Sequence, residues 1–70
     1  MTTLKATVKT RKQGFEGLLT VIENGKKLYS VPCKTIRIKD YDALTDAEEQ
    51  AQDWIDMSKG VDAIIKSQSL

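Results

Sequence analysis

The stretch TDAEEQAQDWIDMSKG, residues 45–60, has the clearest helical pattern in the chain. At about 100° per residue, its apolar and small side chains gather on one side of a helix. That side carries Leu44, Ala47, Ala51, Trp54, Ile55, Met57 and Ser58. The opposite side carries Glu48, Glu49, Gln52, Asp53 and Asp56. A helix of this kind needs another element, here a sheet, to cover its apolar side.

Both ends of this helix have sequence signals. Thr45 followed by Glu48 has the spacing of a capping box, in which each side chain bonds a backbone N–H at the helix start. Gly60 can adopt the left-handed conformation that closes a helix. We therefore expect a helix over residues 45–59 that Gly60 ends.

Three stretches before the helix predict β-strands. Residues 4–11 alternate, residues 17–23 are rich in Leu, Val and Ile, and residues 27–31 form the third stretch. A turn over residues 12–15 joins the first two. Asn24-Gly25 predicts a type I′ hairpin between the last two, because that turn needs a positive φ at both positions.

The strand pattern is interrupted after residue 31 and then resumes. Pro32 cannot donate to a β-ladder, so pairing should stop there or shift to a sheet edge. Residues 35–39 alternate again, with Ile36 and Ile38 expected to point inward. This segment is a short fourth strand or the continuation of the third after a bulge.

The C-terminal segment fits two structures. Val61, Ile64 and Ile65 fit one side of a short helix, and the same residues have strand propensity. We favour the short helix for residues 61–66, with a strand as the alternative. The whole chain, residues 1–70, is then one α+β domain: a three- to four-stranded antiparallel sheet with one main helix packed on one face.

Pairing the hairpins assigns side chains to the two faces of the sheet. A two-residue second loop sets Val21 opposite Leu28, Thr20 opposite Tyr29 and Leu18 opposite Val31. A four-residue first loop sets Val8 opposite Leu19 and Ala6 opposite Val21. The face under the helix then carries Ala6, Val8, Leu19, Val21 and Leu28. A one-residue slip in either hairpin would exchange the faces.

Length and composition favour a small, non-membrane protein. A chain of 70 residues buries only about 60% of its unfolded surface, so a partner or self-association would add stability. The single cysteine, Cys33, excludes an internal disulfide and accords with a reducing compartment. No apolar run is long enough for a signal peptide or a membrane span. We expect a cytoplasmic protein.

The charge is divided between the two halves of the chain. Residues 1–39 hold nine Lys or Arg and two acids, for a net charge of +7. Residues 40–70 hold two Lys and eight acids, for a net charge of −6. A small domain with this split should have one basic and one acidic surface.

No set of side chains in the sequence indicates catalysis. The chain has no histidine, which removes the usual general base and the commonest metal ligand. Cys33 therefore has no histidine to activate it and is expected to be inert. Asp40 and Asp42 are too few oxygen ligands for a calcium site. We expect no enzyme activity, no cofactor and no bound metal.

The uncovered sheet face is the expected binding surface, basic at its sides and apolar through its middle. The candidate binding residues are Lys5, Lys9, Arg11, Leu18, Ile22, Lys27, Tyr29 and Val31. An exposed apolar cluster of this kind usually contacts a partner. A homodimer through this face is one alternative. The acidic side of the helix is a second candidate surface, with Glu48, Glu49, Asp53 and Asp56.

The hairpin Glu23-Asn24-Gly25, followed by an acidic amphipathic helix with Trp54 near its end, resembles small phage inhibitors of bacterial CRISPR complexes, chiefly those of the type I-F systems. The resemblance covers about residues 17–57. It implies a protein that binds a nucleic-acid-handling complex and occupies its surface.

Part of the same region resembles the arm-site DNA-binding module of tyrosine integrases. The shared features are a Gly-Lys turn, here Gly25-Lys26-Lys27, and a helix of the form T-x-x-E-A-x-x-W, which Thr45, Glu48, Ala51 and Trp54 follow in part. This resemblance implies that the sheet enters the major groove. Its contacts would be Lys5, Lys9, Arg11, Lys27 and Tyr29.

Two functions follow from these features. The first is a non-catalytic phage or mobile-element protein that inhibits a host nucleic-acid-handling complex, as anti-CRISPR proteins do. The second is a nucleic-acid-binding module that uses the basic sheet face. The acidic helix favours the first, because it would repel nucleic acid and attract a basic protein surface. Integrase modules are also normally joined to a catalytic domain, whereas this sequence ends at Leu70.

Overall fold

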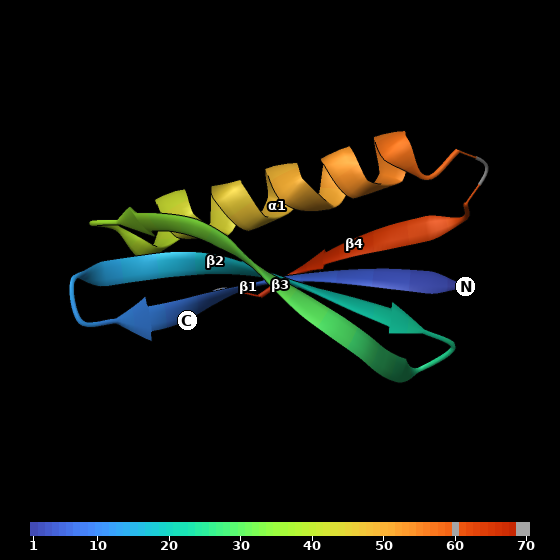
Figure 1. The fold of residues 1–70 in the computed structure, drawn as a ribbon, viewed down its shortest axis with the longest axis horizontal. Helices are drawn as coiled ribbons and strands as arrows, with labels where there is room; N and C mark the ends of the chain where they lie inside the picture. Colours follow the sequence, from blue (N-terminus) through green and yellow to red (C-terminus); the bar gives the residue numbers. More distant parts are fainter. Residues whose placement is uncertain (60, 69–70) are drawn as a thin grey trace.

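The computed structural model describes residues 1–59 and 61–68 and contains a four-stranded sheet with one helix packed on it. The elements are β1 (Thr2–Arg11), β2 (Gly14–Glu23), β3 (Lys26–Arg37), α1 (Asp40–Met57) and β4 (Ala63–Ser67). The strand order is β3-β2-β1-β4, and α1 lies along one side of the twisted sheet (Figure 1). The predicted α+β fold is confirmed, with a sheet that is mostly but not entirely antiparallel.

The C-terminal segment is a strand, so the preferred prediction of a helix over residues 61–66 is wrong. β4 pairs in parallel with β1, from Thr2↔Ala63 to Ala6↔Ser67. Parallel strands need a long crossover connection, and α1 provides it by crossing the sheet from β3 to β4. The free edge of β1, which local sequence does not reveal, decides between the two structures.

The first hairpin has a two-residue loop, Lys12-Gln13, rather than four residues. Arg11 pairs with Gly14, so Ala6 lies opposite Leu19 and Val8 opposite Gly17. The expected pairs were therefore wrong by two residues. A shift of two leaves every side chain on its predicted face. The core accordingly contains the predicted Ala6, Val8, Leu19 and Val21, together with Leu4.

The second hairpin has the predicted turn, with φ of 51° at Asn24 and 81° at Gly25. Its pairing then shifts at a β-bulge, because Ile22 pairs with Lys27 but Val21 pairs with Tyr29. Leu28 is the extra residue and is 56% exposed, although we expected it in the core. The pairs beyond the bulge are Val21–Tyr29, Thr20–Ser30, Leu19–Val31 and Leu18–Pro32.

The bulge moves two predicted surface residues to the helix side of the sheet. Residues directly opposite each other in an antiparallel pair point to the same face. Tyr29 and Val31 therefore share the face of Val21 and Leu19, which is the face that α1 covers. The expected positions of Tyr29 and Val31 on the open face were wrong for this reason.

β3 continues through Pro32 as far as Arg37, which confirms the alternative of one strand with a bulge. It is an edge strand, where the missing N–H of proline is tolerated. The irregularity lies near Lys34, whose φ is 62°. Ile36 and Ile38 are exposed rather than inward, Ile38 by 88%.

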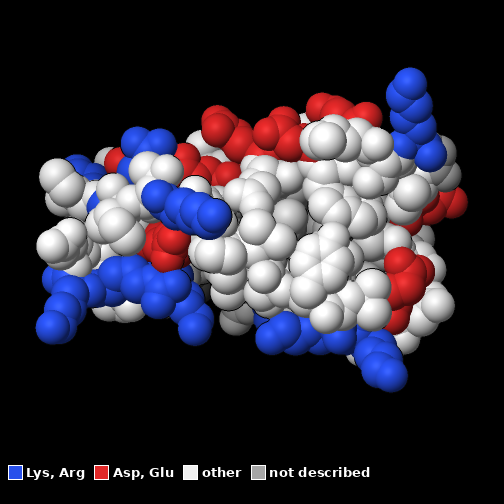
Figure 2. All heavy atoms as spheres, in the orientation of Figure 1, with Lys and Arg blue, Asp and Glu red and all other residues white. Residues whose placement is uncertain are grey.

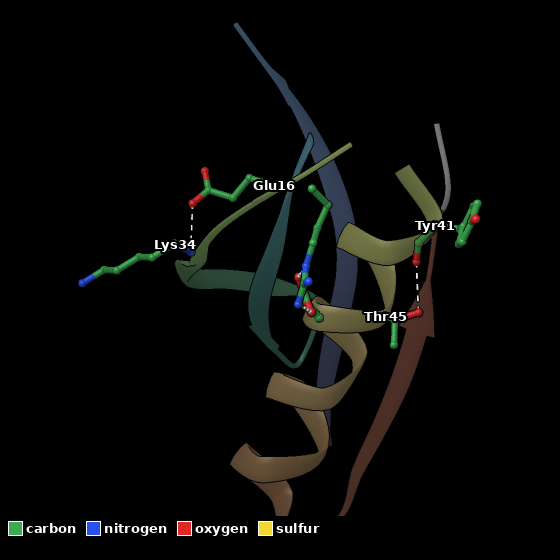
Figure 3. Close-up of polar contacts among 6 residues, drawn as sticks. Glu16, Lys34, Tyr41 and Thr45 are labelled. Atoms are coloured by element: carbon green, nitrogen blue, oxygen red, sulfur yellow. Dashed lines mark hydrogen bonds and ion pairs between the residues drawn. The ribbon is translucent and has the colours of Figure 1, made fainter. Parts of the chain in front are cut away.

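The helix begins at Asp40 and not at Thr45, so the predicted capping box is wrong. The Asp40 carboxylate accepts the Tyr41 backbone N–H, at 2.8 Å. Inside the helix, the Thr45 hydroxyl donates to the Tyr41 carbonyl at 3.0 Å (Figure 3). Glu48 accepts a hydrogen bond from Ser67 instead of capping the backbone. The predicted role of Gly60 lies outside the described residues.

The helix meets the sheet through small residues. Ala43, Ala47 and Ala51 are fully buried. At Gly17 of β2, an added Cβ would lie 2.3 Å from the Ala43 carbonyl oxygen and 3.0 Å from the Ala47 nitrogen. The backbones of α1 and β2 are therefore in direct contact. Of the larger predicted core residues, Trp54 and Ile55 pack at its margin, whereas Met57 is 84% exposed.

We expect Gly17→Ala to lower the free energy of unfolding by about 3 kcal/mol, the upper end of the range for overpacking. The new methyl group would meet backbone atoms of α1, which cannot move aside as a flexible side chain can. Urea denaturation followed by circular dichroism measures the change.

The matched control is Gly25→Ala in the hairpin turn. Nothing lies within 4 Å of an added Cβ there, so only the positive φ is unfavourable, at a cost of about 1 kcal/mol. If Gly17→Ala destabilised the protein no more than Gly25→Ala, close contact between α1 and β2 would not be a constraint on the fold.

Candidate functional site

The side of the sheet opposite α1 forms a surface that we call the open sheet face. Its residues follow from the strand register: Thr3, Lys5, Thr7, Lys9 and Arg11 of β1, Glu16, Leu18, Thr20 and Ile22 of β2, Lys27, Ser30, Pro32 and Ile36 of β3, and Ile64 and Lys66 of β4. The hydroxyls of Thr20 and Ser30 lie 3.0 Å apart across two strands, as this assignment requires.

Most of the predicted binding residues lie on this face. Lys5, Lys9, Leu18, Ile22 and Lys27 are brought together there by β1, β2 and β3. The two exceptions are Tyr29 and Val31, which the bulge turns toward α1.

β4 also contributes to this face, which was not predicted from the sequence. Lys66 lies beside Lys5, and Ile64 lies beside Thr3. The strand propensity of residues 61–66 was the available signal, and the competing helical spacing of the same residues outweighed it.

Arg11 lies on the open sheet face but is held by Glu16. Its Nε and Nη2 both lie 2.8 Å from Glu16 Oε1. The second carboxylate oxygen accepts the Lys34 backbone N–H at 2.9 Å, where β3 is irregular (Figure 3). Glu16 is almost fully buried, so this pair is structural. The guanidinium of Arg11 is therefore not free to contact a partner.

The remaining lysines of the open sheet face are available to a partner. Within the part of the chain that the structure describes, Lys5, Lys9, Lys27 and Lys66 are in no ion pair. They surround Leu18 and Ile22, which are half-buried. In Figure 2 many basic side chains lie at the left end and along the bottom of the molecule, and acidic side chains lie along the top, over α1.

Five of the seven acidic residues of α1 form one row along its β3 side. Asp42, Asp46, Glu49, Asp53 and Asp56 follow one another at alternating spacings of four and three residues. Asp46 is bound by Arg37 of β3, with Nε–Oδ2 at 2.7 Å and Nη2–Oδ1 at 2.9 Å. The hydrogen bonds that Arg37 donates to Asp46 raise the pKa of Arg37, and the negative charge of Asp46 adds to the effect. This bidentate pair joins α1 to β3.

The predicted acidic surface is divided by the structure. Glu49, Asp53 and Asp56 belong to the row on the β3 side. Glu48 lies toward the other edge of the sheet and accepts a hydrogen bond from Ser67 of β4. Glu48 is therefore a contact between elements rather than part of the acidic row.

A shallow hollow of about 310 Å³ separates α1 from β3. It is lined by Cys33, Thr35, Asp46, Glu49, Gln50 and Asp53. Among the described residues, no three His, Cys, Asp or Glu side chains are placed to hold a metal ion. The carboxylates of Glu49 and Asp53 line the hollow, whereas the carboxylate of Asp46 is bound to Arg37.

Trp54 belongs to the predicted apolar side of the helix, and the structure places it at the margin of the core. Its indole Nε1 donates to the Tyr29 hydroxyl at 3.0 Å. Tyr29 is 45% exposed, so this aromatic pair connects the core to the surface beside β3.

Comparison of the chain with protein-family models, with curated proteins and with solved structures gives no match. Over the residues that are described, no helix is long and apolar enough to cross a membrane.

We expect Cys33 to react slowly with iodoacetamide at neutral pH. Burial raises the pKa of its thiol above the ordinary value of 9.0, and the carboxylates of Asp46 and Glu16 raise it further. Because the thiolate is the reactive form, the alkylation rate should rise with pH, with a midpoint above 9.0. The variant Asp46→Asn should move that midpoint to lower pH. A midpoint at or below the ordinary value in the folded parent would contradict this assignment.

Proposed function

We propose that this chain is a non-catalytic interaction protein whose open sheet face binds a protein that handles nucleic acid. On this proposal it acts as an inhibitor by occupying the partner's surface, as the small CRISPR inhibitors that it resembles do. The observation that supports the proposal most is the arrangement of the open sheet face. Leu18 and Ile22 form its apolar centre, and Lys5, Lys9, Lys27 and Lys66 surround them.

An apolar centre with a charged rim is the usual anatomy of a protein–protein interface. The lysines of the rim need not break ion pairs within the described chain before they contact a partner. Their long side chains can also lie over apolar surface while the ammonium groups remain in water.

Two features favour a protein over nucleic acid as the partner. Proteins that bind single strands stack the bases on aromatic side chains. Among the residues assigned to the open sheet face, none is aromatic, because the bulge places Tyr29 on the other side. The acidic row of α1 would repel a nucleic acid that wrapped around the molecule and would attract a basic protein surface.

Nucleic-acid binding is the second candidate, and a specific observation favours it. The open sheet face combines four lysines with the hydroxyls of Thr3, Thr7, Thr20 and Ser30. Ammonium and hydroxyl groups are common donors to phosphate oxygens. Binding of this kind would depend on backbone charge and not on base sequence.

The double variant Lys9→Glu/Lys66→Glu should lose at least tenfold in affinity for the protein partner, because it reverses charge on the rim of the open sheet face. The control Lys12→Glu/Lys59→Glu has the same net charge but reverses two exposed lysines outside that face. The immobilised parent and both variants are incubated with nuclease-treated cell lysate, and the recovered proteins are compared. Equal recovery by the parent and Lys9→Glu/Lys66→Glu would place the binding surface elsewhere.

Titration with random duplex DNA at several salt concentrations separates the two candidates. Under the first proposal, binding to duplex is weak at physiological salt. If the four lysines instead contact phosphates, log K should fall with log salt at a slope of about −3.6. Tight binding with that slope, together with no protein recovered after nuclease treatment, would favour the nucleic-acid module.

A further inference from the structure

A second apolar surface lies between α1 and β3, away from the open sheet face. We call it the α1–β3 patch, and it consists of Leu28, Tyr29, Trp54 and Met57. The bulge leaves Leu28 exposed next to Tyr29, and Tyr29 accepts the Trp54 N–H. Met57 follows Trp54 by three residues and so lies on the same side of the helix.

This patch differs from scattered hydrophobic residues on a surface, because contacts between α1 and β3 fix the positions of its side chains. Its aromatic pair is fixed by a hydrogen bond between two elements, at 3.0 Å. Tryptophan and tyrosine are also the residues that contribute most to protein interfaces. Met57 and Leu28 extend the patch with side chains that are more than half exposed. By contrast, the helix covers the core with three alanines.

Opposite charges flank the patch on its two long sides. Asp53 and Asp56 lie on the helix side, in the acidic row. Lys26 and Lys27 precede Leu28 in β3, and both are exposed. In Figure 2 uncharged side chains occupy the area over β3 and the C-terminal half of α1, with acidic residues above it and basic residues below it.

We propose that a second copy of this chain covers the α1–β3 patch in a two-fold symmetric dimer. An interface of this type brings the same surface of both copies together, so that surface must complement itself. With the two-fold axis parallel to α1, the acidic side of each patch faces the lysine side of the other. The apolar centres then meet in the middle. A second copy of the chain therefore places an opposite charge against each charged side of the patch, and such a copy is present wherever the protein is made.

A homodimer through the open sheet face, the alternative expected from the sequence, lacks this complementarity. Pairing of two open sheet faces brings lysines against lysines, because the carboxylate of Glu16 on that face is already bound to Arg11. A dimer through the α1–β3 patch shares Lys27 with the rim of the open sheet face, because Lys27 lies opposite Ile22. The proposed function is tested at Lys9 and Lys66, which lie outside the patch, so the two proposals can fail independently.

Charge reversal on each side of the patch tests the dimer. Sedimentation velocity over a hundredfold range of concentration should show the parent dimerising. Asp53→Lys/Asp56→Lys and Lys26→Glu/Lys27→Glu should each raise the dimer dissociation constant at least tenfold, because each places like charges across the interface. An equimolar mixture of the two variants should dimerise again, since reversed acids then face reversed lysines. This rescue requires both variants to be folded.

Substitution of the apolar centre gives an independent control. Leu28→Asp should abolish dimerisation, whereas Ile38→Asp, which changes a more exposed residue outside the patch, should not. A parent that stays monomeric throughout the concentration range overturns the proposal. A dimer that neither reversal weakens, or a mixture that fails to recover dimer after both reversals have removed it, overturns it as well.

Discussion

The close contact between α1 and β2 at Gly17 is the constraint on which the rest of the structure depends. Because a Cβ at this position would collide with the helix backbone, the helix can lie this deep only over glycine. The helix residues that face the sheet are correspondingly small, namely Ala43, Ala47 and Ala51. Little volume then remains for large side chains from the helix itself, and the large buried side chains, Leu4, Leu19 and Val21, come from the sheet. Trp54 and Ile55 accordingly pack at the margins of the core, and the bidentate Arg37–Asp46 pair also joins elements at the side of the helix.

The two hairpins show which parts of the fold can be predicted from the sequence and which parts cannot. Side chains alternate with a period of two, so an error of two residues in the first hairpin left Ala6, Val8, Leu19 and Val21 on their predicted face. In the second hairpin a single extra residue exchanged the faces of Tyr29 and Val31. The turn itself was predictable, because Asn and Gly readily adopt the positive φ that a type I′ turn needs. The bulge depends on how a whole strand fits β2 and α1, and no local pattern encodes it.

Two further predictions from the sequence were wrong, and both depend on contacts between elements that are distant in the chain. Residues 61–66 have both helical spacing and strand propensity, and only the free edge of β1 selects the strand. Without β4, Lys66 and Ile64 could not be assigned to the open sheet face. The helix begins at Asp40, before its amphipathic pattern becomes clear, so Thr45 bonds the Tyr41 carbonyl within the helix instead of capping its start. Amphipathic periodicity predicted that the helix exists, whereas packing set its bounds.

The bulge at Leu28 determines which side chains lie on the open sheet face and which lie in the α1–β3 patch. By turning Tyr29 away from the open sheet face, it leaves that face with lysines, hydroxyls and aliphatic side chains, a composition poorly suited to base stacking. By bringing Tyr29 to Trp54, it builds an aromatic pair at the opposite side of the same edge strand. A regular hairpin would have put Tyr29 on the open sheet face, beside the lysines and away from Trp54. One inserted residue in β3 therefore separates a basic surface from an apolar patch that has charges of both signs at its borders.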